Sequence, residues 1–390
     1  MKITRETLHR KSYLLYVFLF TLYFTYNLLF MHVEVPTIFK YISYVFLTTG
    51  FISWAVSFIS CEHTKKELTA HIIMIGYFVY LIAASGFSNF GPLTIALSFS
   101  SIKGIKIRDA AKSTFKGILA IISVFILLCT LDIIPSYVEN KTDLFGVVFS
   151  MNRLGGVHGN VLFSVFFMLL SSLLYGYKKY ITKIHLVFLE LITIGLFLLV
   201  YSRTGILMCT LEILFYMVMT NKKHITINEK IKAMARKLIP YIIPAIAVFC
   251  VIVPQYYYGS WVYNAANNAI TNRFLSAHVY YQAYGFSLLP HSIKEFMVFD
   301  NMYAYIFVLY GAINYILCMT LMFLTVKKLL KERRNEDSMQ LIMIALYAVS
   351  EKVFFKTIGV FPILFIGEYI QTKLLSKKEK RLDKISTKNR

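Results

Sequence analysis

Long, nearly unbroken blocks of apolar residues dominate the chain, and short polar stretches separate them. Two clear blocks are residues 12–31 and 303–325, each long enough as a helix to cross ~30 Å of hydrocarbon at 1.5 Å per residue. The blocks lack the period-two alternation of transmembrane strands, and lipid offers the backbone no hydrogen-bond partners. The pattern therefore predicts an all-α, polytopic transmembrane helical bundle.

We expect about twelve membrane spans and a single integral membrane domain over residues 1–390, because the chain has no soluble block, linker or fixed-period repeat. The expected spans lie near residues 12–31, 41–60, 69–85, 90–101, 117–134, 161–177, 185–201, 204–220, 239–257, 303–325, 339–350 and 357–371.

Two connections, about 135–160 and 259–302, are much longer than the others, and such connections inside a compact protein are usually functional. In the second, apolar and aromatic side chains recur at helical spacing, which predicts an amphipathic helix on the membrane surface. These residues are Ile270, Phe274, Leu275, His278 and Tyr281.

The composition and charge refine this picture. Hydrophobic residues make up 57% of the chain and charged residues 16%, which excludes an ordinary soluble domain. A net charge of +21 would suggest nucleic acid in a soluble protein, but 33 of the 41 Lys and Arg residues lie on one side of the expected topology. By the positive-inside rule, both termini and the basic tail 372–390 face the cytoplasm of a bacterial plasma membrane, and the two long loops face outward. No nucleic-acid motif accompanies the charge.

Three arginines are among the eight cations expected on the outer side. Arg153 lies in NRLGGVHGN, Arg203 in SRTG between two apolar blocks, and Arg273 in the second long loop. A guanidinium matches phosphate oxygens two at a time and stays charged at any ordinary pH, so the three predict an anion site. The alternative for Arg153 and Arg273 is contact with lipid headgroups. Arg203 has almost no polar linker around it, which favours a position facing the bundle interior.

Other polar residues leave alternatives open. Asp300 stands at the start of an apolar block, where it could cap a helix or act as a proton acceptor at the outer surface. The outer histidines, His158, His278 and His291, have no metal-ligand spacing, and four of the five cysteines lie within apolar blocks, so no metal site or disulfide framework is expected. Three carboxylates inside the blocks each require a partner, as proton or cation sites of a transporter or as paired polar groups. They are Glu190, Glu212 and Glu368.

The order of these motifs resembles that of the Wzy-type polysaccharide polymerases, relatives of the O-antigen ligases. The resemblance covers roughly residues 145–325: NRLGGVHGN leading into a helix, SRTG between two helices, NRF in a long outer loop, and a helix start of the form DNxY…YG. The chain departs from many relatives by carrying Asp300 where a His-Asn pair often opens that helix.

The resemblance implies an enzyme, a membrane glycosyltransferase that needs no cofactor. Such polymerases join oligosaccharide repeat units linked to undecaprenyl diphosphate into a capsule, exopolysaccharide or O-antigen on the outer face of the plasma membrane, alongside a flippase and a chain-length regulator. It implies that Arg203 and Arg273 bind the leaving diphosphate and that Asp300 orients or deprotonates the acceptor. Substrate binding would involve Arg153, His158, Asn301 and Tyr303.

Two other functions fit the same pattern. A lipid-linked oligosaccharide flippase or another 12-span transporter has the same number of spans, although the outer arginines cluster in residues 153–273 without counterparts in the first third. An O-antigen ligase-type transferase would move a finished glycan to a different acceptor. Tyrosines in or near the second long loop fit stacking on sugar rings, and equally an interfacial aromatic belt. They include Tyr256, Tyr257, Tyr258, Tyr263, Tyr280, Tyr281 and Tyr284.

Overall fold

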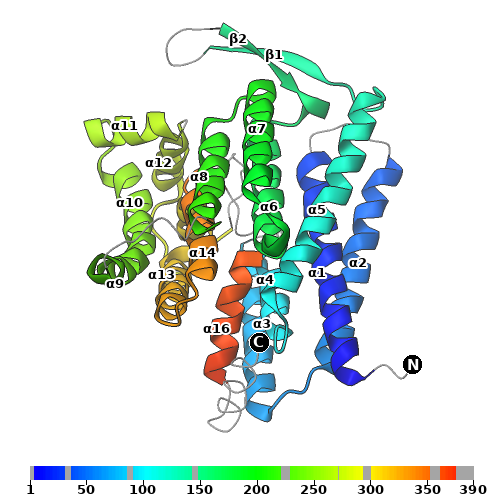
Figure 1. The fold of residues 1–390 in the computed structure, drawn as a ribbon. Coiled ribbons are helices and arrows are strands. Elements are labelled where there is room, and N and C mark those ends of the chain that lie inside the picture. Colours follow the sequence, from blue (N-terminus) through cyan, green and yellow to red (C-terminus); the bar gives the residue numbers. More distant parts are fainter. Residues whose placement is uncertain are drawn as a thin grey trace.

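The computed structural model describes residues 4–30, 37–85, 91–142, 148–220, 229–270, 272–292, 300–351 and 361–374. This part of the chain is helical, as predicted, apart from one two-stranded hairpin (Figure 1). The elements in chain order are α1 (Arg5–Phe30), α2 (Thr37–Ser60), α3 (Lys65–Ala84), α4 (Gly91–Ser100), α5 (Ile107–Thr130), β1 (Tyr137–Thr142), β2 (Val148–Arg153), α6 (Gly159–Gly176), α7 (Lys183–Val200), α8 (Arg203–Thr220), α9 (Glu229–Leu238), α10 (Ile242–Tyr256), α11 (Trp261–Ala269), α12 (Arg273–Tyr284), α13 (Met302–Lys331), α14 (Asn335–Tyr347) and α16 (Leu364–Leu374).

Eight helices among the described residues are long and apolar enough to cross a membrane, which indicates a multi-pass membrane protein. They are Arg5–Phe30, Tyr41–Ser60, Lys65–Ala84, Ile107–Thr130, Gly159–Gly176, Lys183–Val200, Ala233–Tyr256 and Met302–Lys331. The expected count of about twelve is not confirmed by these eight. With 10 and 13 residues, α4 and α14 fall short of ~30 Å. Of the other two expected spans, α8 carries Arg203 and Glu212, and the block near 357–371 lies partly outside the described residues.

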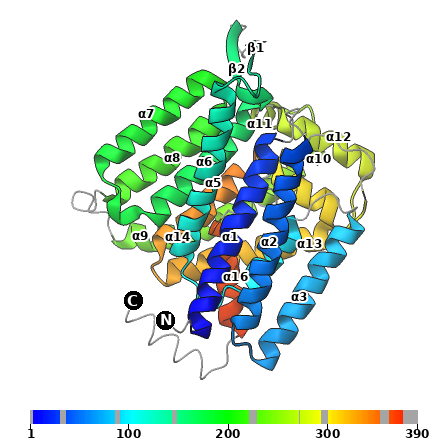
Figure 2. The ribbon, with the colours of Figure 1, turned by 90° about the vertical axis from the view of Figure 1, so that its right-hand side faces the viewer.

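The most buried of the long apolar helices are α1, α6 and α13. In the most apolar 18-residue stretch of each, 67%, 67% and 61% of the residues are buried. By contrast, the corresponding windows of α3 and α7 are only 22% and 17% buried, and the two helices lie at opposite edges of the molecule (Figure 2). Their exposed side chains are apolar, as with Ile73 on α3 and Leu198 on α7. Exposed apolar faces of this size on peripheral helices are what contact with lipid requires.

Ion pairs join the basic connections at one end of the bundle. Arg10 on α1 pairs with Asp109 on α5, and the neighbouring Arg108 contacts Glu336 on α14 at 3.5 Å. Lys178, which follows α6, reaches the same Glu336 carboxylate at 2.6 Å. These contacts bring together connections that the charge pattern predicts on a single side of the membrane. The start of α1 and the end of α16 lie at this end as well (Figures 1 and 2).

The opposite end carries the hairpin together with α11 and α12 (Figure 1). The strands β1 and β2 pair antiparallel from Tyr137 opposite Arg153 to Thr142 opposite Val148. The sequence analysis did not predict this hairpin, which occupies most of the first long connection. Its position places both long connections at one end of the molecule.

The helix predicted over Ile270–Tyr281 exists but begins later. Ile270 closes α11, and α12 starts at Arg273 after Asn272 adopts a left-handed backbone with φ of 62°. Phe274 and Tyr281 face the bundle, as the periodicity predicts, because α12 packs on α10 and α13. The helix is therefore anchored to the protein core in addition to any contact with the membrane surface.

A break in α13 is the main irregularity among the membrane-spanning helices. Gly311 has φ of 81° and ψ of 166°, a backbone conformation essentially restricted to glycine. The extended segment 287–291 fits against the break: the Ala312 N–H donates to the Ser287 carbonyl at 2.9 Å, and the His291 N–H donates to the Leu309 carbonyl at 3.3 Å. Irregular backbone inside a membrane protein is stable only with such protein partners.

We expect Gly311→Ala to destabilise the protein, because a Cβ there would lie 2.6 Å from the Leu288 carbonyl oxygen and the conformation alone costs of order 1–3 kcal/mol. The matched control is Gly76→Ala in α3, where a Cβ meets nothing within 4 Å and alanine favours the helix. Thermal unfolding of the detergent-solubilised variants measures both. Equal melting temperatures for Gly311→Ala and the parent would contradict a structural role for the break.

Candidate functional site

The two glycine-containing motifs, NRLGGVHGN and SRTG, meet where α6 and α8 begin. The Ser202 hydroxyl donates to the Asn160 side-chain oxygen at 2.8 Å, and it accepts the Gly205 N–H at 3.3 Å to cap α8. A Cβ on Gly159 would lie 2.2 Å from the Val200 carbonyl oxygen, so only glycine permits this approach of α6 to the end of α7. The N-terminal ends of two helices, both carrying partial positive charge, are thereby held side by side.

Arg203 is the first residue of α8, directly after the capping Ser202. Its side chain is half-buried, and it makes no hydrogen bond or ion pair with any residue that the structure describes. A guanidinium has five donors, and leaving them unused in a half-buried position is unfavourable unless water or an anion accepts from them. Among the arginines whose side chains the structure describes at the predicted site, Arg203 is therefore the one without a protein partner.

Arg273 lies in a different environment. Its guanidinium is buried and donates to the Glu351 carboxylate at 2.6 Å, to the Ser350 carbonyl, and to the Ile270 carbonyl at 2.9 Å. These three acceptors occupy the planar fork, so the predicted direct grip on a diphosphate is not the arrangement found here. Arg273 instead fixes α12 to the segment that follows α14.

The helix cap that was considered for Asp300 is formed by its neighbour Asn301. The N-cap of α13 is Asn301, whose side-chain oxygen accepts the Ala304 N–H at 3.0 Å, so the interpretation of Asp300 as the cap is wrong. Asp300 is half-buried and forms no hydrogen bond or ion pair with the described residues. Asn301, predicted to bind substrate, is buried and occupied by capping.

Tyr303 is also a packing residue. Its side chain is fully buried, and its hydroxyl donates to the Ala345 carbonyl at 2.8 Å, which attaches α13 to α14. Close by, the Met302 N–H donates to the Ala348 carbonyl at 2.9 Å. The prediction that Tyr303 contacts substrate is therefore corrected, because no part of its ring reaches a surface.

His158 and Arg153 flank the start of α6. His158 is the N-cap of α6, with Nδ1 accepting the Asn160 N–H at 3.3 Å, and its side chain is half-buried. Arg153 ends β2, but its side chain lies outside the part that the structure describes. The predicted binding role of Arg153 stays a prediction, and that of His158 is compatible with its position beside Ser202.

The end of α14 and the residues after it, from Ala345 to Glu351, connect these positions. This stretch accepts from Tyr303, Met302 and Arg273, and Tyr347 within it lies 3.2 Å from the Ser164 hydroxyl on α6. Sequence reasoning missed Glu351. The signal in the sequence was its position directly after an apolar block, LIMIALYAVSE. A carboxylate at the edge of such a block requires a partner, as the carboxylates inside the blocks do.

One face of α6 carries polar side chains in its first and last turns, separated by Phe167 and Met168, and it faces α8 and α14. Asn160, Ser164, Ser171 and Tyr175 follow one another at helical spacing, and each is hydrogen-bonded to a neighbouring helix or its start. We call these four residues the α6 polar face. It runs from the Arg203 end to Asp337, which accepts from Tyr175 at 2.8 Å. Interhelical hydrogen bonds of this kind fix helices in lipid, where apolar surfaces alone give little preference.

The three intramembrane carboxylates have the partners that were expected. Glu212 accepts from Ser171 at 2.8 Å and from Gln340 at 2.9 Å, and Glu190 accepts from Thr210 at 2.7 Å. Glu368 receives two parallel hydrogen bonds from Arg334, at 2.9 and 2.8 Å. Among the described residues no group of three His, Cys, Asp or Glu side chains could hold a metal ion.

The tyrosines near the second long connection divide into two groups. Tyr256, Tyr257 and Tyr258 are exposed at the end of α10, with 72%, 52% and 55% of their surface accessible. Tyr263, Tyr280 and Tyr281 are buried in packing. The seventh, Tyr284, is half-buried, with its ring centroid 5.7 Å from that of Tyr280. The exposed group has the most surface available for stacking on a sugar or for an interfacial belt. Comparisons with family models, curated proteins and solved structures found no match to this chain.

We expect Glu351→Gln to lower the stability by about 3–5 kcal/mol, because it leaves the buried Arg273 guanidinium without a counter-charge. Glu332→Gln is the matched control, since Glu332 is exposed and lies 3.8 Å from Lys328, a geometry worth about 0.5 kcal/mol or less. Thermal unfolding of both variants in detergent provides the measurement. Similar losses in the two variants would show that the buried pair does not anchor α12.

Proposed function

We propose that the protein is a membrane glycosyltransferase that polymerises oligosaccharide repeat units linked to undecaprenyl diphosphate on the outer face of the bacterial plasma membrane. The observation that carries the proposal is Arg203, a half-buried arginine without a protein partner among the described residues, placed at the adjoining starts of α6 and α8. The order of the motifs NRLGGVHGN, SRTG, NRF and DNxY…YG supports it.

The chemistry follows from charge development in glycosyl transfer. When the anomeric carbon leaves its lipid diphosphate, negative charge grows on the departing oxygens, and a preorganised guanidinium beside helix N-termini stabilises that charge. Arg203 takes this role, with His158 close by at the start of α6. Arg273 acts through position, since it holds α12 in place through Glu351.

The acceptor sugar must lose a hydroxyl proton as it attacks. Asp300 fits a general base because its carboxylate is half-buried and the helix cap is supplied by its neighbour Asn301. A series of hydrogen bonds links the elements that carry Asp300 and Arg203. The start of α13 bonds to the end of α14, Tyr347 of α14 bonds to α6, and α6 bonds to Ser202 at the start of α8.

The topology belongs to the same proposal. The end with the hairpin, α11 and α12 would face outward as the large outer region, and the end joined by Arg10, Lys178 and Glu336 would face the cytoplasm together with both termini. About twelve spans are proposed by counting α4, α8, α14 and α16 as shorter or polar spans within the bundle. A ligase-type transferase would use the same residues with a different acceptor.

A transporter, such as a flippase for lipid-linked sugars, is the second candidate, and the α6 polar face favours it. Buried carboxylates with polar partners are typical of proton-coupled carriers, and Glu212 on α8 accepts a hydrogen bond from Ser171 of this face. Movement of labelled lipid-linked sugar across vesicles containing only this protein would support transport over polymerisation.

Arg203→Lys should shorten the polymer and reduce its yield by at least about tenfold, because an ammonium keeps the charge but cannot hold two diphosphate oxygens at once. The assay uses purified full-length protein and lipid-linked repeat units. Arg10→Lys, at the opposite end of the bundle, is the control and should retain activity. Normal polymer from the Arg203 variant would reject its role in binding the diphosphate.

Asp300→Asn should reduce polymerisation by about 10²–10⁴-fold while leaving the melting temperature unchanged, since it removes the basic carboxylate and keeps the shape. Asn301→Ala gives the contrasting result: loss of the α13 cap at a cost of about 1 kcal/mol in stability. Both variants are measured in the polymer assay and by thermal unfolding. An active Asp300→Asn protein would exclude Asp300 as the base.

A further inference from the structure

A cluster of three buried polar side chains joins α6, α8 and α14 in the interior of the bundle. The Ser171 hydroxyl oxygen lies 2.8 Å from Glu212 Oε1 and 2.6 Å from Gln340 Oε1, and Gln340 Nε2 lies 2.9 Å from the same Glu212 oxygen. The three residues are at most 4% exposed. Each of these contacts has the length of a hydrogen bond, so the cluster requires three hydrogens.

An ionised Glu212 would leave the cluster with only two of these hydrogens. The Gln340 amide occupies one contact, and the single Ser171 hydroxyl hydrogen occupies one of its two oxygen contacts. Turning the Gln340 amide over exchanges its nitrogen and oxygen but leaves the count at two. A proton on Glu212 Oε1 supplies the third hydrogen in either orientation, because a protonated carboxyl group is also a donor.

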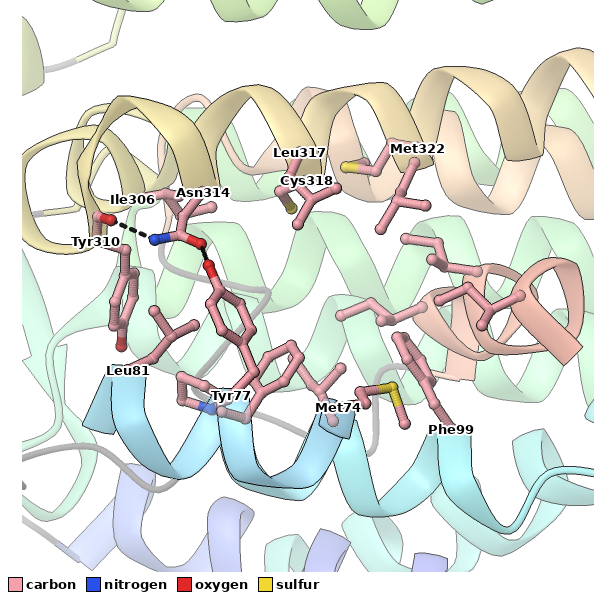
Figure 3. A pocket seen from close by; sticks show the side chains of 17 residues that line it. Met74, Tyr77, Leu81, Phe99, Ile306, Tyr310, Asn314, Leu317, Cys318 and Met322 are labelled. Atoms are coloured by element: carbon pink, nitrogen blue, oxygen red, sulfur yellow. Dashed lines mark hydrogen bonds between the residues drawn. The ribbon is translucent and has the colours of Figure 1, made fainter. Parts of the chain in front are cut away.

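A polar contact elsewhere in the bundle shows the ordinary balance of donors and acceptors. In the apolar groove between α3 and α13, the Tyr77 hydroxyl donates to the Asn314 side-chain oxygen, and the Asn314 amide donates to the Tyr310 carbonyl at 2.6 Å (Figure 3). Each of these contacts has its own hydrogen, with every group in its ordinary protonation state. The missing hydrogen at Glu212 is therefore a property of that cluster.

Among the residues that the structure describes, none balances a negative charge on Glu212. The carboxyl group forms no ion pair with them, and its second oxygen, Oε2, is buried without a hydrogen-bond partner. A carboxylate in such a place is strongly disfavoured and takes up a proton. The titratable groups that face Glu212 or its direct neighbours come from α8, α7, α14 and α6, and none of them is a cation: Cys209, Tyr216, Glu190, Glu336 and Tyr175.

We propose that Glu212 is a proton-binding site whose proton joins α8 to α6 and α14. The Glu212 carboxyl group donates this proton to Ser171 or to Gln340, according to the orientation of the amide. Release gives a carboxylate and a free proton, and it leaves one of the three contacts without a hydrogen. Because α8 begins at Arg203, the proton acts on the helix that carries the candidate site. The inference rests on these contacts and is independent of the proposed function.

The polar contacts of the cluster lead on to one end of the bundle. Gln340 Nε2 donates to the Tyr216 hydroxyl at 3.2 Å, and Tyr216 donates to Glu336 at 3.2 Å. Glu336 pairs with Lys178 at 2.6 Å, and 12% of its side-chain surface is exposed. The proton of Glu212 therefore exchanges with water at the end of the bundle that the ion pairs join.

Infrared spectroscopy of the purified full-length protein at neutral pH tests the proton directly, because a protonated carboxyl group has a C=O band separate from that of a carboxylate. We expect such a band in the parent, shifted in D₂O and lost in Glu212→Gln. Glu190→Gln is the matched control and should keep the band, since the hydrogen bond from Thr210 to Glu190 at 2.7 Å needs no proton on the carboxylate. A band that persists unchanged in Glu212→Gln would overturn the inference.

Glu212→Asp keeps an acid at this position and serves as the second variant if Glu212→Gln does not fold. With ¹³C in the carboxyl groups of glutamate, the parent band should shift. In Glu212→Asp the band should shift with labelled aspartate instead. A band that still follows the glutamate label in the Asp variant would assign the proton to another residue and reject the proposal.

The effect on α8 is measured by hydrogen–deuterium exchange of its backbone amides at alkaline pH, with all proteins at the same pH. The parent and Glu190→Gln should exchange about tenfold faster than Glu212→Gln, whose amide supplies the third hydrogen without titrating. Equal exchange in the parent and in Glu212→Gln would show that the proton does not hold α8. None of these measurements uses a glycan substrate, so failure of the inference is distinguishable from failure of the proposed function.

Discussion

Lipid cannot accept or donate hydrogen bonds, and the arrangement of this protein follows from that constraint. Each polar group inside the bundle needs a partner from the protein itself. The α6 polar face meets this need on α8 and α14, and the segment 287–291 meets it for the backbone freed at Gly311. Arg203 is a half-buried polar group without such a partner among the described residues, and this is why the proposed function assigns it to a ligand.

The same constraint bears on the different surroundings of Arg203 and Arg273. Arg273 has Glu351 and two carbonyls around it, and its charge serves packing. Arg203 follows Ser202, whose hydroxyl donates to Asn160 and accepts from the Gly205 N–H, and Arg203 itself has no acceptor among the described residues. The ion pairs of the charged residues elsewhere, such as Glu336 with Lys178, lie at the other end of the bundle.

Sequence reasoning predicted a helical membrane protein and predicted that Glu212 and Glu368 have partners, because hydrophobic length and the cost of burying charge are local or nearly universal rules. It did not identify those partners, Ser171 and Gln340 for Glu212 and Arg334 for Glu368. It did not find the Arg273–Glu351 pair, since residues far apart in the chain give no pairing signal without their helices in place. It considered a helix cap only at Asp300, whereas Asn301 forms the cap of α13, because either side chain can cap a helix and the choice depends on where the first turn closes.

The Arg273–Glu351 pair has a consequence for how the protein is made. A ribosome delivers helices to the membrane in order, so Arg273 is inserted well before Glu351 is synthesised. During that interval the Arg273 guanidinium can pair only with water, lipid phosphates or transient partners. The contact that holds α12 in place is therefore missing. Maturation of this end of the molecule therefore waits for the last part of the chain, and truncated products that stop before Glu351 would present a loose helix to quality-control proteases.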